Sequence, residues 1–142
     1  MSFYEYKPGK EYIARLDHFA DLLEAITELA QNTKIKAGRF TAIGALKNAK
    51  IGYYNQDMKK YEDIVFNQHC ELAACIGNVS LKDGGVFVHA HVVLSDDAGN
   101  SKSGHLISGR VFAAEVHLTE LTGPDLERKY DGLTGLSLWD IK

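Results

Sequence analysis

The amino-acid sequence predicts an α+β fold, in which a mostly antiparallel β-sheet packs with helical structure in a single domain. Two observations carry this prediction. Hydrophobic residues recur at helical spacing in one segment, 19–32, and most of the remaining chain reads as strands separated by short turns. Strands that follow one another through short turns run antiparallel, and helix plus antiparallel sheet is typical of α+β proteins. A length of 142 residues suits one domain over 1–142.

The first two elements are a strand and a helix. Residues 11–18 (EYIARLDH) are expected to form the strand. In the helical segment, FADLLEAITELAQN, apolar residues fall at i, i+3, i+4 and i+7, which is one buried face of an amphipathic helix. Asp17 and Asp21 lie near its start, where acidic groups favour the helix dipole, and Asn32–Thr33 is expected to end it. This helix supplies core packing and no chemical signal.

The later elements are expected to be strands. Turn sequences such as Asp83-Gly84-Gly85 and the run 96–100 separate them. The expected strands are 38–43 and 48–54, joined around Gly44, then 61–66, 70–81, 86–94 and 105–121. The tail from 126 onward keeps several leucines and the single tryptophan, so it should dock on the domain.

Composition narrows the function classes. The formal net charge of -3 provides no global basic field for nucleic acid. No apolar run approaches the roughly 20 residues of a bilayer span, and the polar start lacks a signal core, so we expect a cytoplasmic protein without a membrane partner. Cys70 and Cys75 lie five residues apart on one expected strand and should face opposite sides. We therefore expect neither a disulfide nor a shared metal, but two small buried hydrophobic side chains.

Two histidines lie in the strand VFVHAHVVL, residues 86–94. Because side chains alternate along a strand, His89 and His91 point to the same face, about 7 Å apart at their Cα atoms. If the following hairpin is symmetric about Ala98, His91 lies directly opposite His105, with Cβ atoms roughly 4.5–5.5 Å apart. His89 would then face Ile107. A slip of one residue would move His105 to the other side of the sheet.

Three converging imidazoles predict a zinc site. Zinc binds imidazole nitrogen and prefers tetrahedral geometry, with water or a substrate atom in the fourth position. Gly104 removes a side chain that would crowd this site. The other three histidines, His18, His69 and His117, are not expected to lie beside further histidines. Glu115 is expected on the same face of its strand as His105. Three roles are open for it: a hydrogen bond to a histidine that ligates the metal, a catalytic base, or an ordinary surface residue.

One basic segment keeps nucleic-acid binding open. Residues 29–56 contain five basic residues and no acidic ones, with Tyr53 and Tyr54 near the end. The candidate contacts to an anion or a nucleic acid are Lys34, Lys36, Arg39, Lys47 and Lys50. Separated lysines on strand faces are also an ordinary solvated surface, and no recognition helix is apparent.

Several segments together resemble the plants-and-prokaryotes-conserved (PPC) domain, and the chain looks like a stand-alone archaeal or bacterial member. The segments, which cover most of the chain in order, are GRFTAIGALKNAKIGYY (38–54), CELAACIGNVSL (70–81), VHAHVVL (88–94), GHLISGRVFAAEVHLTEL (104–121) and LERKYDGLTGL (126–136). The resemblance implies an antiparallel sheet flanked by helices, assembled as a homotrimer. It also implies one metal per chain, usually zinc, on His89, His91 and His105. Relatives are often labelled DNA-binding, but this chain lacks the Arg-Gly-Arg-Pro hook of the plant proteins.

From the residues and the resemblance together we expect a zinc-binding PPC-domain protein whose activity is unknown, with a small molecule or a protein as ligand. That it assembles as a homotrimer is what the resemblance implies. One alternative is a metal-dependent hydrolase or lyase with a three-histidine zinc-water site, in which Glu115 would act as base and Arg39 would hold an anionic substrate. The H-E-x-x-H pattern, which pairs zinc ligands with a catalytic glutamate, is absent. We therefore favour a binding protein over an enzyme. The other alternative is a DNA-binding regulatory protein.

Overall fold

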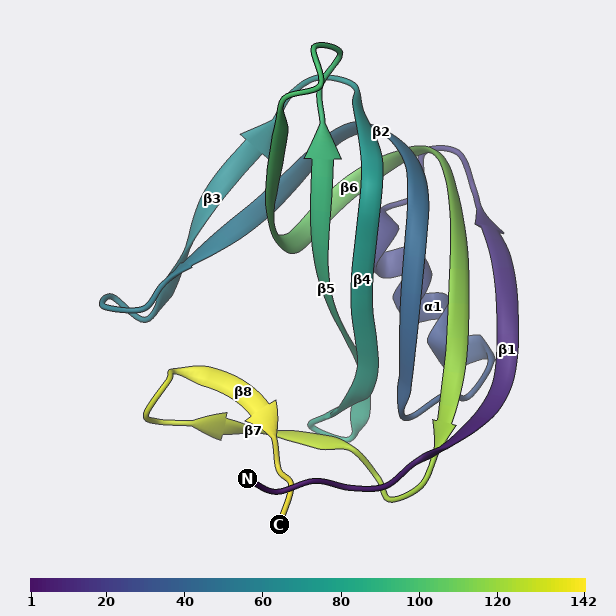
Figure 1. Cartoon of the computed structure of the whole chain (residues 1–142), viewed down its shortest axis with the longest axis vertical. Coiled ribbons are helices and arrows are strands. Elements are labelled where there is room, and N and C mark those ends of the chain that lie inside the picture. Colours follow the sequence, from purple (N-terminus) through teal and green to yellow (C-terminus); the bar gives the residue numbers. More distant parts are fainter.

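The computed structural model describes all 142 residues and contains eight strands and one helix (Figure 1). The strands are β1 (Lys7–Leu16), β2 (Gly38–Asn55), β3 (Lys60–Phe66), β4 (Cys70–Lys82), β5 (Gly85–Ser95), β6 (Ser101–Thr122), β7 (Glu127–Asp131) and β8 (Leu136–Trp139). The helix α1 spans Leu22–Asn32. Its length of 11 residues is well short of a bilayer span, and no helix of the structure has the length and hydropathy to cross a membrane.

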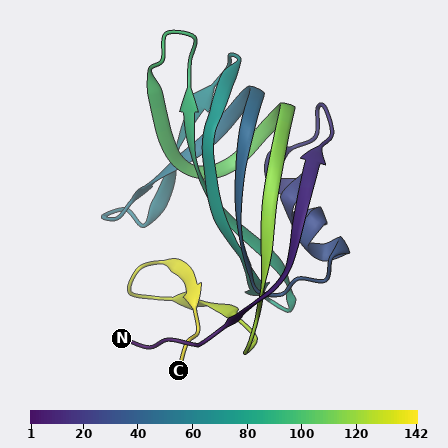
Figure 2. The ribbon, with the colours of Figure 1, turned by 45° about the vertical axis from the view of Figure 1, so that its right-hand side comes forward.

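All eight strands belong to one sheet that curls on itself, because two long strands are shared between neighbours. β6 pairs first with β5, then with β2, and its last part, from Ala114 onward, also pairs with β1. β2 pairs with β4 through its first half and with β3 through its second half. Figure 2 shows that β6 bends between its first part, which pairs with β5, and its later part, which pairs with β2 and β1. The start of β6, which carries His105, is thereby brought to the side of β5.

The expected fold class, an α+β domain with a mostly antiparallel sheet flanked by helices, is wrong. The protein is mostly strand, its one helix covers one face, and the sheet is mixed because β4 and β7 pair in parallel at Leu81–Glu127 and Lys82–Arg128. The C-terminal tail docks as the hairpin β7–β8. Its turn is set by Asp131, whose carboxylate accepts hydrogen bonds from the backbone N–H and the hydroxyl of Thr134. Only α1 has the helical periodicity that a helix in water requires.

The helix begins three residues later than its apolar pattern suggests. Asp21 is the N-cap, and its Oδ1 accepts hydrogen bonds from the backbone N–H groups of Leu23 and Glu24. Its Oδ2 accepts a third from the N–H of Gly109 in β6, which ties the helix to the sheet. The buried face of α1 packs into the main core through Leu22, Ile26 and Ala30.

Two bulges change what strict alternation predicts. The strands expected at 38–43 and 48–54 are one strand, β2, which is irregular between Ala42 and Gly44. Gly44 has a φ of +152° and lies against the backbone of β6. In β4 a bulge between Leu72 and Ala74 resets the alternation, so the prediction that Cys70 and Cys75 face opposite sides is wrong. Both thiols are buried in the same core and are free, as expected.

Candidate metal centre

The β5–β6 hairpin has the predicted register, with His91 directly opposite His105. The turn is fixed by Asp96, whose Oδ1 accepts hydrogen bonds from the backbone N–H groups of Ala98 and Asn100. Pairing between β5 and β6 ends at His105, so the expected pair of His89 with Ile107 does not form. His89 instead lies opposite Asn78 of β4. Three neighbouring strands therefore place the histidines.

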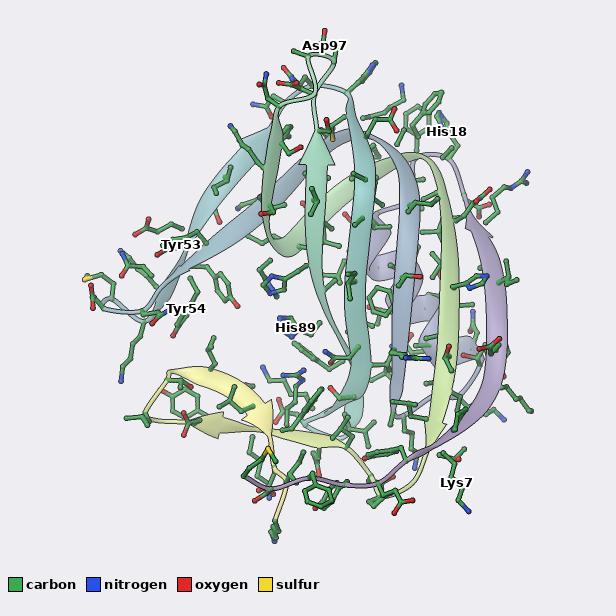
Figure 3. All side chains as sticks on the ribbon, viewed as in Figure 1. Lys7, His18, Tyr53, Tyr54, His89 and Asp97 are labelled. Atoms are coloured by element: carbon green, nitrogen blue, oxygen red, sulfur yellow. The ribbon has the colours of Figure 1, made fainter.

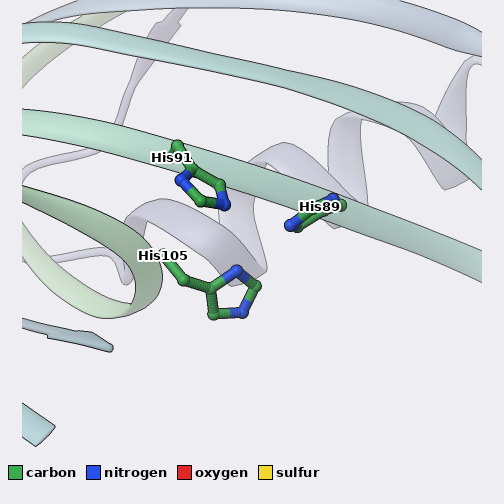
Figure 4. Close-up of side chains that lie close together, drawn as sticks. All are labelled: His89, His91 and His105. Carbon is green, nitrogen blue, oxygen red and sulfur yellow. The ribbon is translucent and has the colours of Figure 1, made fainter. Parts of the chain in front are cut away.

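The three histidine side chains converge on one point (Figure 4). One nitrogen from each of His89, His91 and His105 lies within 4.8 Å of the other two. The ring centroids are 5.0 Å apart for His89 and His105, and 5.2 Å apart for His89 and His91. His91 is exposed, whereas the other two side chains are half-buried. Nδ1 of His105 is a buried nitrogen without a hydrogen-bond partner.

The surroundings favour the neutral form of His89 and His105. Burial lowers the pKa of His89 to about 4, and the neighbouring His105, Arg128 and His91 add to the shift. Burial, followed by the effect of His91, also lowers the pKa of His105. A neutral imidazole is the form that ligates a metal ion. The donor set, its spacing and the unpartnered nitrogen therefore fit a divalent cation that accepts imidazole nitrogen.

Aromatic residues of the β2–β3 hairpin cover one side of the centre. The Tyr61 ring stacks on His105 with centroids 4.7 Å apart, and Tyr54 packs edge-on against Tyr61. The Tyr54 hydroxyl donates a hydrogen bond to the carbonyl oxygen of Thr134, in the turn between β7 and β8. The hairpin and the tail are thereby tied together, and His89 lies in the region between them (Figure 3).

Gly104 serves packing and does not relieve crowding among the ligands. A Cβ there would meet the backbone oxygen of Gly52 at 2.8 Å, on the side of the strand away from His105. The residue permits a close approach of β6 to β2.

Sequence reasoning missed Arg128 of β7. This side chain is buried, and its Nε, Nη1 and Nη2 donate hydrogen bonds to Ser80 Oγ, the Ser137 carbonyl oxygen and Asn78 Oδ1, each at 2.9 Å. It lines a hollow of about 450 Å³ that also includes His89. The full lining is Ser2, Asn78, His89, Arg128, Leu138, Trp139 and Ile141. No local pattern in LERKYD indicates the parallel pairing with β4 that brings it there.

Glu115 and Arg39 do not join the triad. Glu115 is exposed and lies ten residues along β6 from His105, roughly 33 Å by strand path, beside Arg15 of β1. Arg39 is exposed on β2, where it pairs with Asn78, so it lies two strands away from His89.

The five basic residues of the segment 29–56 do not form one patch. Lys34 and Lys36 follow the helix, and Arg39 lies near the start of β2. Lys47 lies over the rings of Phe19 and Phe112, 5.2 and 5.5 Å from their centroids. The Nζ of Lys50 is 2.6 Å from a carboxylate oxygen of Asp63.

Comparison with known proteins gives a consistent picture. Residues 4–122 match the family model of the Plants and Prokaryotes Conserved (PCC) domain. A metal-containing protein from Archaeoglobus fulgidus is 42% identical, with 98% of this chain and 99% of that chain covered and a TM-score of 0.94. A plant- and prokaryote-conserved protein from Pyrococcus horikoshii is 41% identical, with 99% and 97% covered and a TM-score of 0.94.

A more distant structure comes from Bacteroides thetaiotaomicron, and its description proposes DNA binding. It is 25% identical, with 97% of each chain covered and a TM-score of 0.87. Among proteins with curated descriptions, none matches this chain.

Proposed function

Because this chain belongs to the Plants and Prokaryotes Conserved domain family, we propose that it is a metal-binding protein whose centre is formed by His89, His91 and His105. The observation that carries the proposal is the convergence of three imidazole nitrogens within 4.8 Å, one ring having a buried nitrogen that no protein group satisfies. The 42% identical Archaeoglobus protein, which is described as metal-containing, supports it.

Zinc, one ion per chain, is the metal that we propose. Three neutral nitrogen ligands without a carboxylate or thiolate suit zinc, although nickel, cobalt and copper share this preference for imidazole. When bound, such an ion supplies a Lewis acid with an open fourth position. The role of this chain is to hold the three rings in position, since each comes from a hydrogen-bonded strand rather than a loop.

We also propose that the chain assembles as a homotrimer. Large apolar side chains project from four strands on the face away from α1, and the most exposed are Ile13 at 77% and Ile76 at 65%. Ile43 and Val93 extend this patch on β2 and β5. Several large apolar side chains exposed on one face, here interspersed with polar residues such as Thr41 and His117, are typical of an interface, and a closed cyclic assembly would cover them. Ile76 pairs directly with His91, so the interface would border the metal centre.

Metal-dependent hydrolysis or a lyase reaction is the second candidate function, because a hollow opens beside His89. The remote position of Glu115 removes the base that the sequence suggested, so this candidate rests on the hollow alone. DNA binding ranks below it, since the basic residues are dispersed and one of them is paired with an acid.

The decisive measurement is metal content per chain. Protein purified without a polyhistidine tag and reconstituted with zinc should hold close to one equivalent, and a His89→Ala/His91→Ala variant should hold none. A His69→Ala/His117→Ala variant is the matched control, because it removes two exposed histidines outside the triad and should keep the ion. Circular dichroism on all three proteins separates loss of metal from loss of fold. A parent that takes up no metal would refute the assignment.

A further inference from the structure

Arg128 is a buried cation without an anionic partner. Its side chain is among the few buried polar ones, with 8% of the residue exposed. Its three hydrogen-bond acceptors are a hydroxyl, a carbonyl and an amide oxygen, all of them neutral. The two ion pairs of the structure, Lys50–Asp63 and Lys129–Asp140, do not include it. A charge held away from water without a counter-ion is costly, and an arriving anion would offset that cost.

The guanidinium is oriented and only partly used. It lies against the rings of Phe87 and Trp139, 5.3 and 5.4 Å from their centroids. A guanidinium has five N–H donors, and three of them are engaged here. One N–H on each terminal nitrogen remains available. These contacts fix the group in place, so a ligand would not have to order a flexible side chain.

This cation is close to the histidines. The Nη2 group of Arg128 donates to Asn78, and Asn78 lies directly opposite His89 across β4 and β5. Opposite residues in a sheet have Cβ atoms roughly 4.5–5.5 Å apart. The same hollow is lined by both Arg128 and His89. A small molecule in this hollow would therefore lie within reach of both the guanidinium and His89.

From this arrangement we propose that the hollow receives a small organic carboxylate, with Arg128 as the residue that binds its charged group. This inference rests on the proposed function, because it names the class of ligand for that centre. None of the residues lining the hollow is acidic, and three of them, Leu138, Trp139 and Ile141, are apolar. Such walls favour an anion with an apolar body over an inorganic oxyanion, which keeps its hydration.

The competing explanation is that Arg128 only fastens the tail to the sheet. The tail has other attachments, since β7 pairs with β4 and the turn before β8 accepts hydrogen bonds from Tyr54 and Lys59. An Arg128→Gln variant should therefore keep the hairpin in place. A purely structural role would change stability without making ligand binding depend on ligand charge.

The experiment uses Trp139, the single tryptophan of the chain, as its reporter. Zinc-loaded protein is titrated with benzoate, with the uncharged isostere benzamide, and with inorganic phosphate, and Trp139 emission is followed. The variants are Arg128→Gln and, as matched control, Lys129→Gln, which removes one positive charge from the same strand at the surface. Metal content is measured for each protein beforehand.

The parent and Lys129→Gln should bind benzoate about tenfold or more tightly than benzamide, and Arg128→Gln should lose that preference with its metal content unchanged. Equal affinity of the parent for benzoate and benzamide would overturn the inference without any variant, and so would tighter binding of phosphate. A metal-loaded parent with no response to benzoate overturns this inference alone. A parent that holds no metal but binds benzoate through Arg128 refutes the metal proposal and leaves the carboxylate site standing.

Discussion

Gly77 lies in the middle of β4, directly opposite Phe40 of β2 and Ala90 of β5. A Cβ at this position would overlap the Phe40 ring, whose Cε1 would be only 2.6 Å away, and the backbone oxygen of His89. Phe40 is 2% exposed and belongs to the main hydrophobic core. The carbonyl of His89 belongs to the sheet and cannot move without disturbing the hydrogen bonds that position this proposed metal ligand.

Gly77→Ala should therefore destabilise the protein strongly for a change of one methyl group. Overpacking costs about 1–3 kcal/mol, and we expect the upper end because ring and backbone are both confined. Urea unfolding at fixed chain concentration measures this, since an assembly makes stability depend on concentration. Gly132→Ala, where nothing lies within 4 Å of the added Cβ, should stay within about 0.5 kcal/mol of the parent.

A double-mutant cycle tests the cause. Phe40→Leu shortens the side chain that Gly77→Ala meets, so the double variant should be more stable than the sum of the single effects by about 1 kcal/mol. Additive effects would mean that the ring is not the obstacle, and a harmless Gly77→Ala would refute the packing argument as a whole.

Three further outcomes follow from other parts of the structure. Asp21→Ala removes the helix cap and the hydrogen bond to Gly109, and it should cost about 2 kcal/mol or more of unfolding free energy in urea, whereas a change under 0.5 kcal/mol would contradict the capping role. Burial raises the pKa of Cys75 to about 12 and also raises that of Cys70, so the thiols stay protonated at pH 8. Neither should react with a disulfide reagent before unfolding, and fast labelling of the native protein would count against this. Ile76→Glu should lower the assembly mass measured by light scattering, while an unchanged trimer would remove this residue from the interface.

The local parts of the fold were predictable from sequence. Helical periodicity indicates α1, and alternating residues with turn chemistry around Ala98 fix the pairing of His91 with His105. Both depend on residues near one another in the chain. The bulge after Leu72 has no such signature, because one extra residue in a strand changes neither composition nor turn signals. Strict alternation therefore predicts the two cysteines on opposite faces, whereas the bulge brings both into the same core.

The candidate site divides in the same way. Its three histidines lie within the 17 residues 89–105. The length of the hairpin loop is therefore enough to predict that His91 pairs with His105. Arg128 reaches the site through a parallel pairing between β4 and β7, whose partners are far apart in the chain. Such pairings depend on tertiary packing, which periodicity does not encode. Glu115 is the opposite case. It alternates in step with His105 along β6, but on a bent strand of 22 residues this does not place the two side chains close together.

The order in which the ribosome delivers these residues has a consequence for assembly. At roughly 5–20 residues per second, Arg128 follows His105 by about 1–5 s, while a hairpin closes in roughly 1–10 μs. An isolated hairpin is only marginally stable in water. An ion bound by its three histidines would stabilise the hairpin in the nascent chain. On the proposed assignment, metal capture is then an early event of synthesis. The carboxylate-binding residue arrives last, at a centre that has already formed.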